Sequence, residues 1–368
     1  MNKKELLSLV DEKILDDKKP QTSYKIKYVQ EYTKLWTIIS AQRDNIKKIN
    51  FIDCMCNAGI YKDGDLGTSM EVLHLFKIYA EKFPSKCFNL FLNDFNKERI
   101  ESSRIIAKHI IGNKIPKNLH VFFSSTDVNS YLTDTSFFDK YLSYDASTLN
   151  FVDPYNFSDV KIKSIRHFAM NYYCEIVFNL FTMDFVRNKD SFRISECLGN
   201  TREIVSKDDF IEEVISQIRV NKMQYAFPYS FKNTNNAEIY QIVFFTPSKK
   251  GLEVLKEALF KVFKGLDAYR NKHTATDLFG GSLFSDDEID EIIIKNCGID
   301  AQNMILKTFS PGIYHYGKLE EFLIEKTVMM DSQIIRYVLS PMIEKGSLIK
   351  KNQKGRKNYK EDYYELKG

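Results

Sequence analysis

The sequence predicts an α/β fold with a parallel sheet closed by an antiparallel hairpin, followed by a C-terminal winged-helix domain. From residue 50 onwards, short and continuously apolar runs alternate with amphipathic stretches of helical length, as in a parallel sheet with crossover helices. Two β-like runs then flank an asparagine-rich turn, which indicates a hairpin. Beyond a glycine- and serine-rich stretch, three helical segments precede two short strands around a basic turn.

Five apolar runs are the predicted parallel strands. They are short and rich in Phe, Ile and Val, as strands covered on both faces should be. They span residues 49–55, 87–94, 119–125, 149–153 and 174–181. The two strands of the hairpin flank the turn Asn233–Asn236.

Amphipathic segments supply the predicted helices. An N-terminal helix at 24–43 precedes the first strand, and Ser158 and Ser206 are each placed to cap the N-terminus of a helix. The helices that follow the strands span 68–83, 97–111, 158–170 and 208–220, and a helix at 251–264 completes this part of the chain.

Length and composition fit two domains. With 368 residues, 43% of them apolar, the chain can bury one large core and one smaller one. We expect an N-terminal helical region at 1–48, a sheet domain at 49–278 and a winged-helix domain at 286–368, with the loop Phe279–Ser285 as the boundary. The last domain has helices at 286–296, 318–325 and 332–345 and a hairpin around Gly355, and 332–345 takes the recognition-helix position.

The start of the chain and its cysteines indicate a cytoplasmic protein. Residues 1–20 mix lysines with five acidic residues and resemble neither a secretory signal nor a transit peptide. No apolar run approaches the roughly 18 residues of a membrane helix, so we expect no membrane contact. The six cysteines are scattered, which favours reduced thiols.

The stretch after the first strand predicts a cofactor loop. Asp53 ends the strand, and Asn57, Gly59 and Tyr61 follow in a tight turn ahead of Gly67-Thr68-Ser69. A nucleotide-binding turn must let backbone amides approach the ligand closely, which requires small residues or residues that tolerate positive φ. Asn57 is the commonest kind of non-glycine residue in that conformation. An ordinary strand-end turn would show the same residues.

Acidic residues after the next two strands extend this prediction. Asp94 follows the second strand, where a carboxylate can accept both ribose hydroxyls of an adenosine cofactor. Asp127 follows the third strand, where it can accept a hydrogen bond from an adenine amine. A helix cap and a turn are the structural alternatives for these two residues.

The sharpest signal is Asp153-Pro154-Tyr155 after the fourth strand, at the carboxyl edge where open α/β sheets bind ligands. The lone pair of an exocyclic base amine is delocalised into the ring, so groups that accept the amine protons prepare it for attack on a methyl sulfonium. Asp153 and the Pro154 carbonyl are such acceptors, and Tyr155 can stack on a flipped base. The alternative is a proline turn with Tyr155 as its lid.

Other chemistries lack their motifs. The six histidines show no HExxH pattern, the cysteines show no second pair at zinc spacing, and no G-x-S-x-G elbow is present. The G-x-G-x-x-G of nicotinamide enzymes is absent after the first strand. The sequence therefore predicts no metal site and disfavours a hydrolase or a dehydrogenase.

Taken together, these residues resemble the three-Cys-motif partner protein (TcmP) family, a bacterial group with a methyltransferase-like domain. The order of the elements is also that of class I S-adenosylmethionine-dependent methyltransferases, which have a Rossmann-like sheet of five parallel strands plus an antiparallel hairpin. The family's N-terminal lysine and aromatic pair match Lys25, Tyr32 and Trp36. Its acidic-x-x-x-Gly-x-Gly-x-Tyr motif after the first strand matches at Asp53, Gly59 and Tyr61. Its acidic residue after the second strand matches Asp94, and its Asp-Pro-Tyr after the fourth strand matches Asp153–Tyr155.

The resemblance spans roughly residues 25–246. It implies S-adenosylmethionine as cofactor, a protein partner with a three-cysteine motif, and a position for Lys25 near the active site. A solvated helix lysine is the alternative for Lys25. The chain departs from the pattern at Asn57, where the family has its first glycine, and in the single proline of Asp153-Pro154-Tyr155, where amino-methyltransferases usually have two.

The C-terminal segment carries the positive charge of the chain. The whole chain has a net charge of +4, whereas residues 345–368 hold eight basic and three acidic side chains, a net +5, which leaves −1 for residues 1–344. The hairpin residues that we expect to meet phosphates of DNA or RNA are Lys350, Lys351, Lys354, Arg356 and Lys357. A solvated basic tail is the alternative.

Three functional hypotheses follow. The first is a methyltransferase that acts on an amino group of a nucleic-acid base, with adenine N6 as a candidate. The second is a non-catalytic module in which a degenerate cofactor fold and the winged helix bind nucleic acid and the partner protein. The third is a methyltransferase for proteins or small molecules whose winged helix serves dimerisation.

Overall fold

The computed structural model describes residues 2–182, 191–200, 202–220, 222–232, 238–263, 286–351 and 359–367. The chain divides into two compact units, Met1–Gly251 and Leu252–Gly368. The predicted boundary loop Phe279–Ser285 and the predicted turn Asn233–Asn236 lie outside the described residues.

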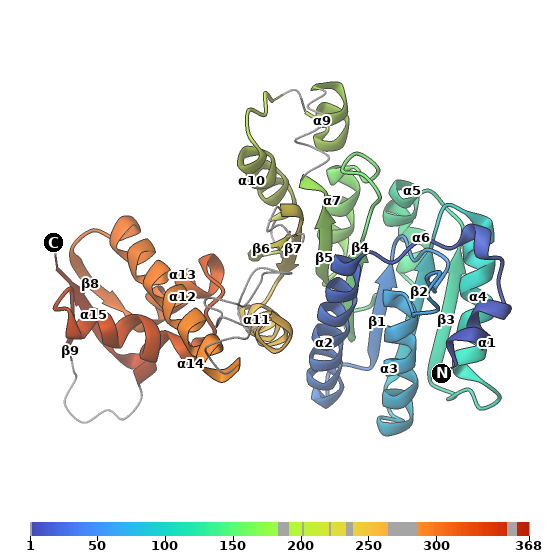
Figure 1. Cartoon of the computed structure of the whole chain (residues 1–368), viewed down its shortest axis with the longest axis horizontal. Helices are drawn as coiled ribbons and strands as arrows, with labels where there is room; N and C mark the ends of the chain where they lie inside the picture. Colours follow the sequence, from blue (N-terminus) through green and yellow to red (C-terminus); the bar gives the residue numbers. More distant parts are fainter. Residues whose placement is uncertain are drawn as a thin grey trace, which may run out of the picture. The chain divides into compact units, whose positions relative to one another are not determined.

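The first unit is built on a seven-stranded sheet with the strand order β3-β2-β1-β4-β5-β7-β6 (Figure 1). The first five strands are parallel, whereas β7 runs antiparallel to both β5 and β6. The strands are β1 Lys48–Asp53, β2 Cys87–Asn93, β3 Leu119–Ser124, β4 Ala146–Val152, β5 Glu175–Leu180, β6 Tyr225–Lys232 and β7 Glu238–Thr246. The predicted α/β fold, with five parallel strands and an antiparallel hairpin, is confirmed. Because β1 pairs with both β2 and β4, the order reverses at β1, where open α/β sheets bind their ligands.

Helices cover both faces of this sheet. On one face α3 packs between α2 and α4, and on the other face α7 packs between α5 and α10. Alternate side chains of β2 point to opposite faces, as the two-residue period of a strand requires. Phe88 packs edge-on against Phe76 of α3, with ring centroids 5.3 Å apart, whereas Phe91 belongs to the cluster that includes Phe168 of α7.

The helices of the first unit mostly begin and end where amphipathic periodicity predicts. The helix at 97–111 matches the prediction at both ends, and Ser206 caps α10 by accepting from the Asp209 amide. Five short segments were not expected: α1, η1, α5, α6 and α9. The elements are α1 Lys3–Ser8, η1 Glu12–Ile14, α2 Pro20–Gln42, α3 Thr68–Lys82, α4 Lys97–Ile111, α5 Val128–Thr133, α6 Thr135–Phe138, α7 Ile162–Asn171, α9 Ser191–Leu198 and α10 Lys207–Ile218. Helix α11 Lys249–Phe263 follows, and from Leu252 onwards it belongs to the second unit.

The predicted Ser158 cap is wrong. Helix α7 begins at Ile162 after Lys161, and the side-chain oxygen of Asn129 accepts from the Lys161 amide at 2.8 Å. Ser158 instead accepts hydrogen bonds from the Arg193 side chain. No side chain caps α7, and the residue that holds the Lys161 amide ahead of the helix lies 32 positions away in the sequence.

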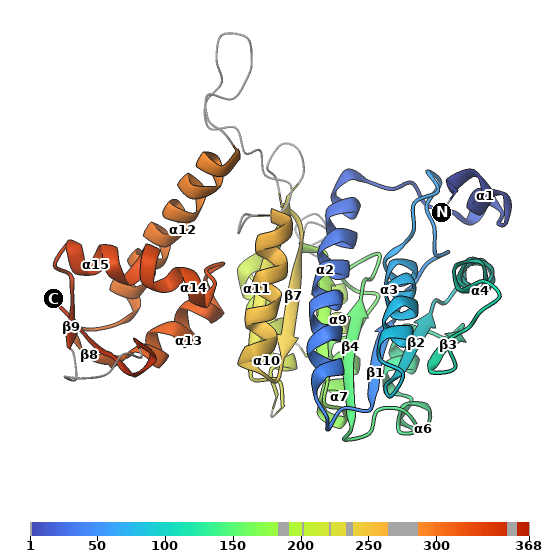
Figure 2. The same cartoon turned by 90° about the horizontal axis from the view of Figure 1, so that it is seen from below.

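The second unit combines helices with a three-stranded antiparallel sheet of order β8-β10-β9 (Figure 2). Its elements after α11 are α12 Asp286–Thr308, β8 Gly312–His315, α13 Tyr316–Lys326, α14 Asp331–Ile334, η2 Ile335–Leu339, α15 Ser340–Glu344, β9 Leu348–Lys351, η3 Tyr359–Glu361 and β10 Tyr363–Leu366. The segments α14, η2 and α15 are continuous and cover the predicted helix at 332–345 except for its last residue. Helix α12 continues twelve residues past the predicted end at 296, and β8 was not expected.

Buried Lys256 joins α11 to α13 within the second unit. Its ammonium donates to the backbone carbonyls of Leu323, Thr327 and Met329, at 3.4, 2.5 and 3.2 Å, at the end of α13 and just beyond it. Burial holds the pKa of this lysine well below its usual range. No helix in the described part of the chain is long and apolar enough to cross a membrane.

Candidate functional site

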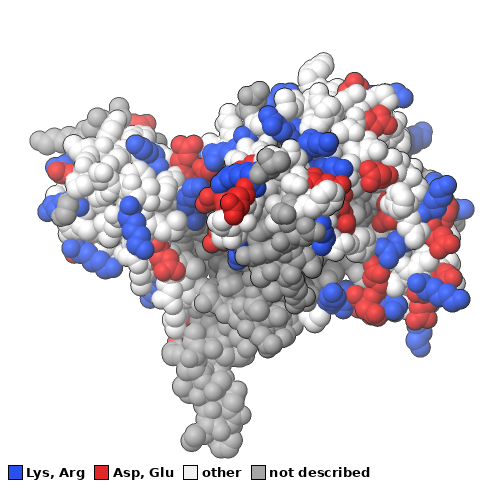
Figure 3. Space-filling model, turned by 90° about the horizontal axis from the view of Figure 1, so that it is seen from above, with Lys and Arg blue, Asp and Glu red and all other residues white. Residues whose placement is uncertain are grey.

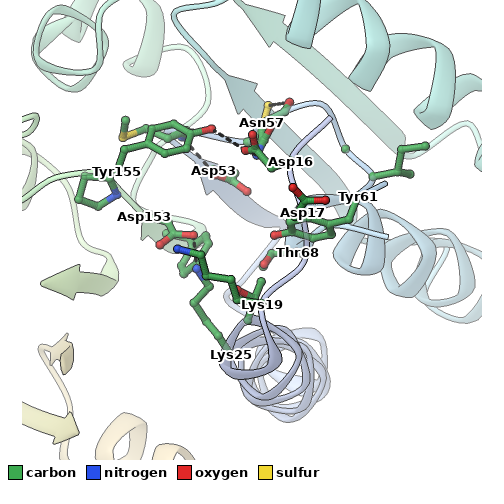
Figure 4. A pocket seen from close by; sticks show the side chains of 18 of the residues that line it. Asp16, Asp17, Lys19, Lys25, Asp53, Asn57, Tyr61, Thr68, Asp153 and Tyr155 are labelled. Atoms are coloured by element: carbon green, nitrogen blue, oxygen red, sulfur yellow. Dashed lines mark hydrogen bonds and ion pairs between the residues drawn. The ribbon is translucent and has the colours of Figure 1, made fainter. Parts of the chain in front are cut away.

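A cavity of about 400 Å³ lies at the carboxyl edge of the parallel sheet (Figure 4). Its walls come from the ends of β1 and β4, the loop after β1, the start of α3 and the segment that leads into α2. Eight of the predicted site residues line it: Lys25, Asp53, Asn57, Gly59, Tyr61, Asp153, Pro154 and Tyr155. The strand order brings these residues together from positions up to 130 apart in the sequence.

Asp53 is a buried carboxylate at the end of β1. It is 2% exposed and accepts hydrogen bonds from the Ser69 hydroxyl at 2.8 Å and from the Met55 amide at 3.2 Å. Burial raises its pKa to about 7, because no cation neutralises it and the two hydrogen bonds offset only part of the desolvation. A cationic ligand in the cavity would favour the ionised form of Asp53.

The loop after β1 has the backbone conformation that its sequence predicts. Asn57 has φ +58° and is the only non-glycine residue with positive φ in the described part of the chain, and Gly59 has φ +83°. A Cβ on Gly59 would lie 3.2 Å from both the Met70 and Ser103 side chains. The Gly67 amide donates to the Gly59 carbonyl at 2.8 Å and closes the loop onto the start of α3.

The N-terminus of α3 opens onto the cavity. Its N-cap residue is Gly67, so no side chain caps the first turn. Thr68 lines the cavity, is 7% exposed, and its hydroxyl finds no hydrogen-bond partner among the residues that the structure describes. Uncapped amides at a helix N-terminus favour an anion, and the Thr68 hydroxyl adds a donor directed at the same space.

Asp153 is held between two donors. The Lys25 ammonium, which rises from α2, lies 2.6 Å from one carboxylate oxygen, and Asn179 of β5 donates to the other. Lys25 is 7% exposed, so the alternative of a solvated helix lysine is wrong. The Pro154 carbonyl accepts no hydrogen bond within the described residues. The Pro154 carbonyl oxygen can therefore accept a hydrogen bond from an amine, and each carboxylate oxygen of Asp153, which has one donor already, can accept one more.

The two outer acidic residues have backbone partners. Asp94 is 5% exposed and accepts from the amides of Asn57 and Asn96 at 3.1 and 2.9 Å, and burial raises its pKa. Asp127 caps α5 by accepting from two backbone amides. Neither residue lines the cavity, although Asp94 is bonded to the loop that does. Phe95, next to Asp94, is 78% exposed.

Sequence reasoning missed the residues that the N-terminal segment contributes. Asp16, Asp17 and Lys19 line the cavity, and Asp16 pairs with Arg99 of α4 at 3.0 Å. These residues belong to a stretch of mixed charge without periodicity, so no local signal marks them. Only the contact with the loop after β1 reveals their position.

Two buried cysteines, Cys54 and Cys56, follow Asp53. Burial raises the pKa of Cys54 and of Cys56 well above the usual range, which keeps both thiols protonated. Within the same residues no three His, Cys, Asp or Glu side chains are placed to hold a metal ion.

The predicted nucleic-acid residues are only partly described. Lys350 pairs with Asp362 at 2.6 Å and Lys351 with Glu365 at 2.5 Å, so both lysines of β9 have acidic neighbours, one just before β10 and one on it. Lys354, Arg356 and Lys357 lie outside the described residues. Basic and acidic side chains are intermixed over the described surface in Figure 3.

Comparison with known proteins gives remote structural similarity only. No family model matches the chain, and no curated protein matches it. Among solved structures, a type I restriction-modification methyltransferase subunit from Streptococcus thermophilus is 13% identical with a TM-score of 0.31. That match covers 71% of this chain and 50% of the subunit, so the chain spans half of its length. A loganic acid methyltransferase with SAH is 10% identical with a TM-score of 0.30, over 68% of this chain and 87% of that one.

Proposed function

We propose that this chain is an S-adenosylmethionine-dependent methyltransferase that acts on an amino group of a nucleic-acid base, with adenine N6 as the candidate atom. The observation that carries the proposal is that Asp53, Thr68, Lys25 and Asp153 gather around one cavity at the switch point of the sheet. The three-Cys-motif partner and the winged-helix assignment of the second unit belong to the same proposal, on the family resemblance and the order of the elements.

The cavity residues fit this cofactor. The uncapped start of α3 and the unpartnered Thr68 hydroxyl suit a carboxylate, whereas Asp53 suits an ammonium or sulfonium. Asp94 and the exposed ring of Phe95 suit a ribose and an adenine at the adjoining strand end. When bound, S-adenosylmethionine would supply an electrophilic methyl group on a positively charged sulfur.

The chain's own residues would prepare the acceptor. Lys25 and Asn179 fix the carboxylate of Asp153, so that it and the Pro154 carbonyl can accept the two protons of an exocyclic amine. Those bonds localise the nitrogen lone pair. Tyr155 is 46% exposed and offers a ring for stacking. The rate would come mainly from holding amine and methyl group in line, because no strong base lies in the cavity.

A non-catalytic binding module is the second candidate. Both oxygens of Asp153 already have donors, and Asn57 stands where the family has glycine. This candidate predicts binding of nucleic acid without methyl transfer.

Transfer of a labelled methyl group to DNA, RNA and protein pools tests the proposal. We expect label in a nucleic-acid pool, and at least a hundredfold loss of transfer in Asp153→Ala with cofactor affinity retained. Thr68→Val should weaken cofactor binding roughly tenfold or more, because a donor to a charged group is lost. Thr37→Val is the matched control, because Thr37 is buried in α2 away from the cavity. Label in protein only, or in no pool, would contradict the proposal.

A further inference from the structure

Asp16 connects the loops that follow three different strands. One carboxylate oxygen accepts from the Asn57 side-chain amide at 2.6 Å and from the Tyr155 hydroxyl at 3.4 Å, and the other pairs with Arg99 at 3.0 Å. Asn57 follows β1, Arg99 lies in the first turn of α4 after β2, and Tyr155 follows β4. Figure 4 shows Asp16 between Asn57 and Tyr155.

Arg99 completes this arrangement. Its guanidinium donates to the Tyr155 hydroxyl with one arm and to Asp16 with the other, and it lies 5.3 Å from the centroid of the Tyr155 ring. Burial raises the pKa of Tyr155, so its hydroxyl stays protonated and donates to Asp16. The ring is thereby fixed by its hydroxyl and contacted by one cation, while nearly half of the side chain remains exposed.

The segment that carries Asp16 is attached mainly to the loop after β1. The Lys62 amide donates to the Asp16 carbonyl at 3.1 Å, Asp17 pairs with the Lys62 side chain, and Lys18 pairs with Asp63 at 3.0 Å. Pairs of this exposure contribute about 1 kcal/mol or less each. Leu15, 3% exposed, is the buried apolar residue of the segment. A shift of the loop would therefore carry Asp16 with it.

We propose that Asp16 couples occupancy of the cofactor loop to the position of Tyr155, so that cofactor binding prepares the ring on which the acceptor base stacks. The physical reason is the shared oxygen: Asn57 and Tyr155 donate to the same atom of Asp16. A ligand that reorients the Asn57 amide, or that displaces Asp16 from the cavity wall, changes the bond to Tyr155. Such coupling is reciprocal, so the cofactor and the acceptor base each favour the binding of the other. The inference rests on the proposed function.

A fluorine label on Tyr155 tests the coupling in the chain of 368 residues. 3-Fluorotyrosine is introduced at position 155, and its ¹⁹F resonance is followed while S-adenosylhomocysteine is titrated, with calorimetry in parallel. We expect a saturable change of the resonance at the affinity that calorimetry gives. In Asp16→Ala the ligand should still bind, and the change of the resonance should be lost.

Asp63→Asn is the matched control. It removes a charge that holds the same segment, keeps the acceptor of the Asp65 amide, and touches neither Asn57 nor Tyr155. Its ¹⁹F response should equal that of the parent protein. Asp16→Asn provides a second variant that preserves side-chain volume, and it should reduce the response because one amide oxygen cannot serve all three donors.

The possible failures are distinguishable. If the ligand binds and the resonance of both Asp16 variants moves as in the parent, the coupling is wrong and the proposed function stands. If calorimetry detects no binding to the parent protein, the proposed function fails and the inference fails with it.

Discussion

Replacing Asp53 with asparagine should make the protein more stable at pH 8 and weaken its binding of S-adenosylmethionine. Burial raises the pKa of Asp53 to about 7 from an ordinary value of 3.8. Between these values the folded protein holds a proton that the unfolded chain has released. The contribution of Asp53 to stability therefore falls as the pH rises from about 4 to about 7, and it stays low above pH 7.

The magnitude follows from this difference in pKa. A shift of about three units corresponds to about 4 kcal/mol of stability lost at pH 8. Asparagine avoids this cost, but its one oxygen accepts from only one of the two donors, Ser69 and Met55, and losing the other costs about 1 kcal/mol. We expect Asp53→Asn to be about 3 kcal/mol more stable than the parent at pH 8 and about 1 kcal/mol less stable at pH 4.

Urea unfolding followed by tryptophan fluorescence measures this effect. Trp36 is the only tryptophan, lies in α2 and is 6% exposed, so its emission reports on the first unit. The reasoning is refuted if Asp53→Asn is no more stable than the parent at pH 8. A gain in stability together with weaker cofactor binding would mark Asp53 as a residue retained for function at the expense of stability.

Three further predictions concern other sites. Glu175 accepts from Tyr32 and Thr246, and burial raises its pKa to about 7. Glu175→Gln should therefore gain about 2 kcal/mol at pH 8 and lose about 1 kcal/mol at pH 4 in the same unfolding assay, because glutamine keeps only one of the two acceptor oxygens; an equal gain at both pH values would contradict this. Lys256→Met should destabilise the second unit by about 2 kcal/mol, because three backbone carbonyls lose their hydrogen-bond donor. Amide hydrogen exchange of α13 measures the loss, and unchanged protection of α13 in the variant would count against the prediction. Alanine at both Lys350 and Lys351 should change the slope of log nucleic-acid affinity against log salt concentration by less than one unit, because both charges are paired with carboxylates. Alanine at the three basic residues of 354–357 should make that slope shallower by about two units or more. Equal effects of the two variants would contradict the assignment of these residues to phosphate contacts.

The sheet was predictable because its strands are continuously apolar. Buried parallel strands such as 87–93 and 175–180 are mainly apolar on both faces, apart from a few buried polar residues, and this leaves a signal in a short window. The helix Lys97–Ile111 was predictable at both ends, because Asn96 caps it and Gly112 follows it with positive φ. Strand β8 was missed because its four residues, Gly312–His315, are too few for a periodic pattern.

The site was predictable wherever a residue stands next to a strand end. Asp53 and Asp153 are found this way, because parallel strands bring their carboxyl ends to one edge. Asp16 and Arg99 were missed because their roles depend on a contact across 83 residues of sequence. Asn179 lies inside β5, where a buried polar residue gives no indication of its partner until the neighbouring strand is known.

Calorimetric titration of the 368-residue chain with S-adenosylmethionine, in two buffers of different ionisation enthalpy at pH 7, tests the central claim most directly. We predict saturable binding of one molecule per chain, with release of part of a proton because the cationic ligand favours the ionised form of Asp53. Asp53→Asn should lose the proton release. The absence of saturable heat in both buffers would contradict the assignment of the cavity as a cofactor site.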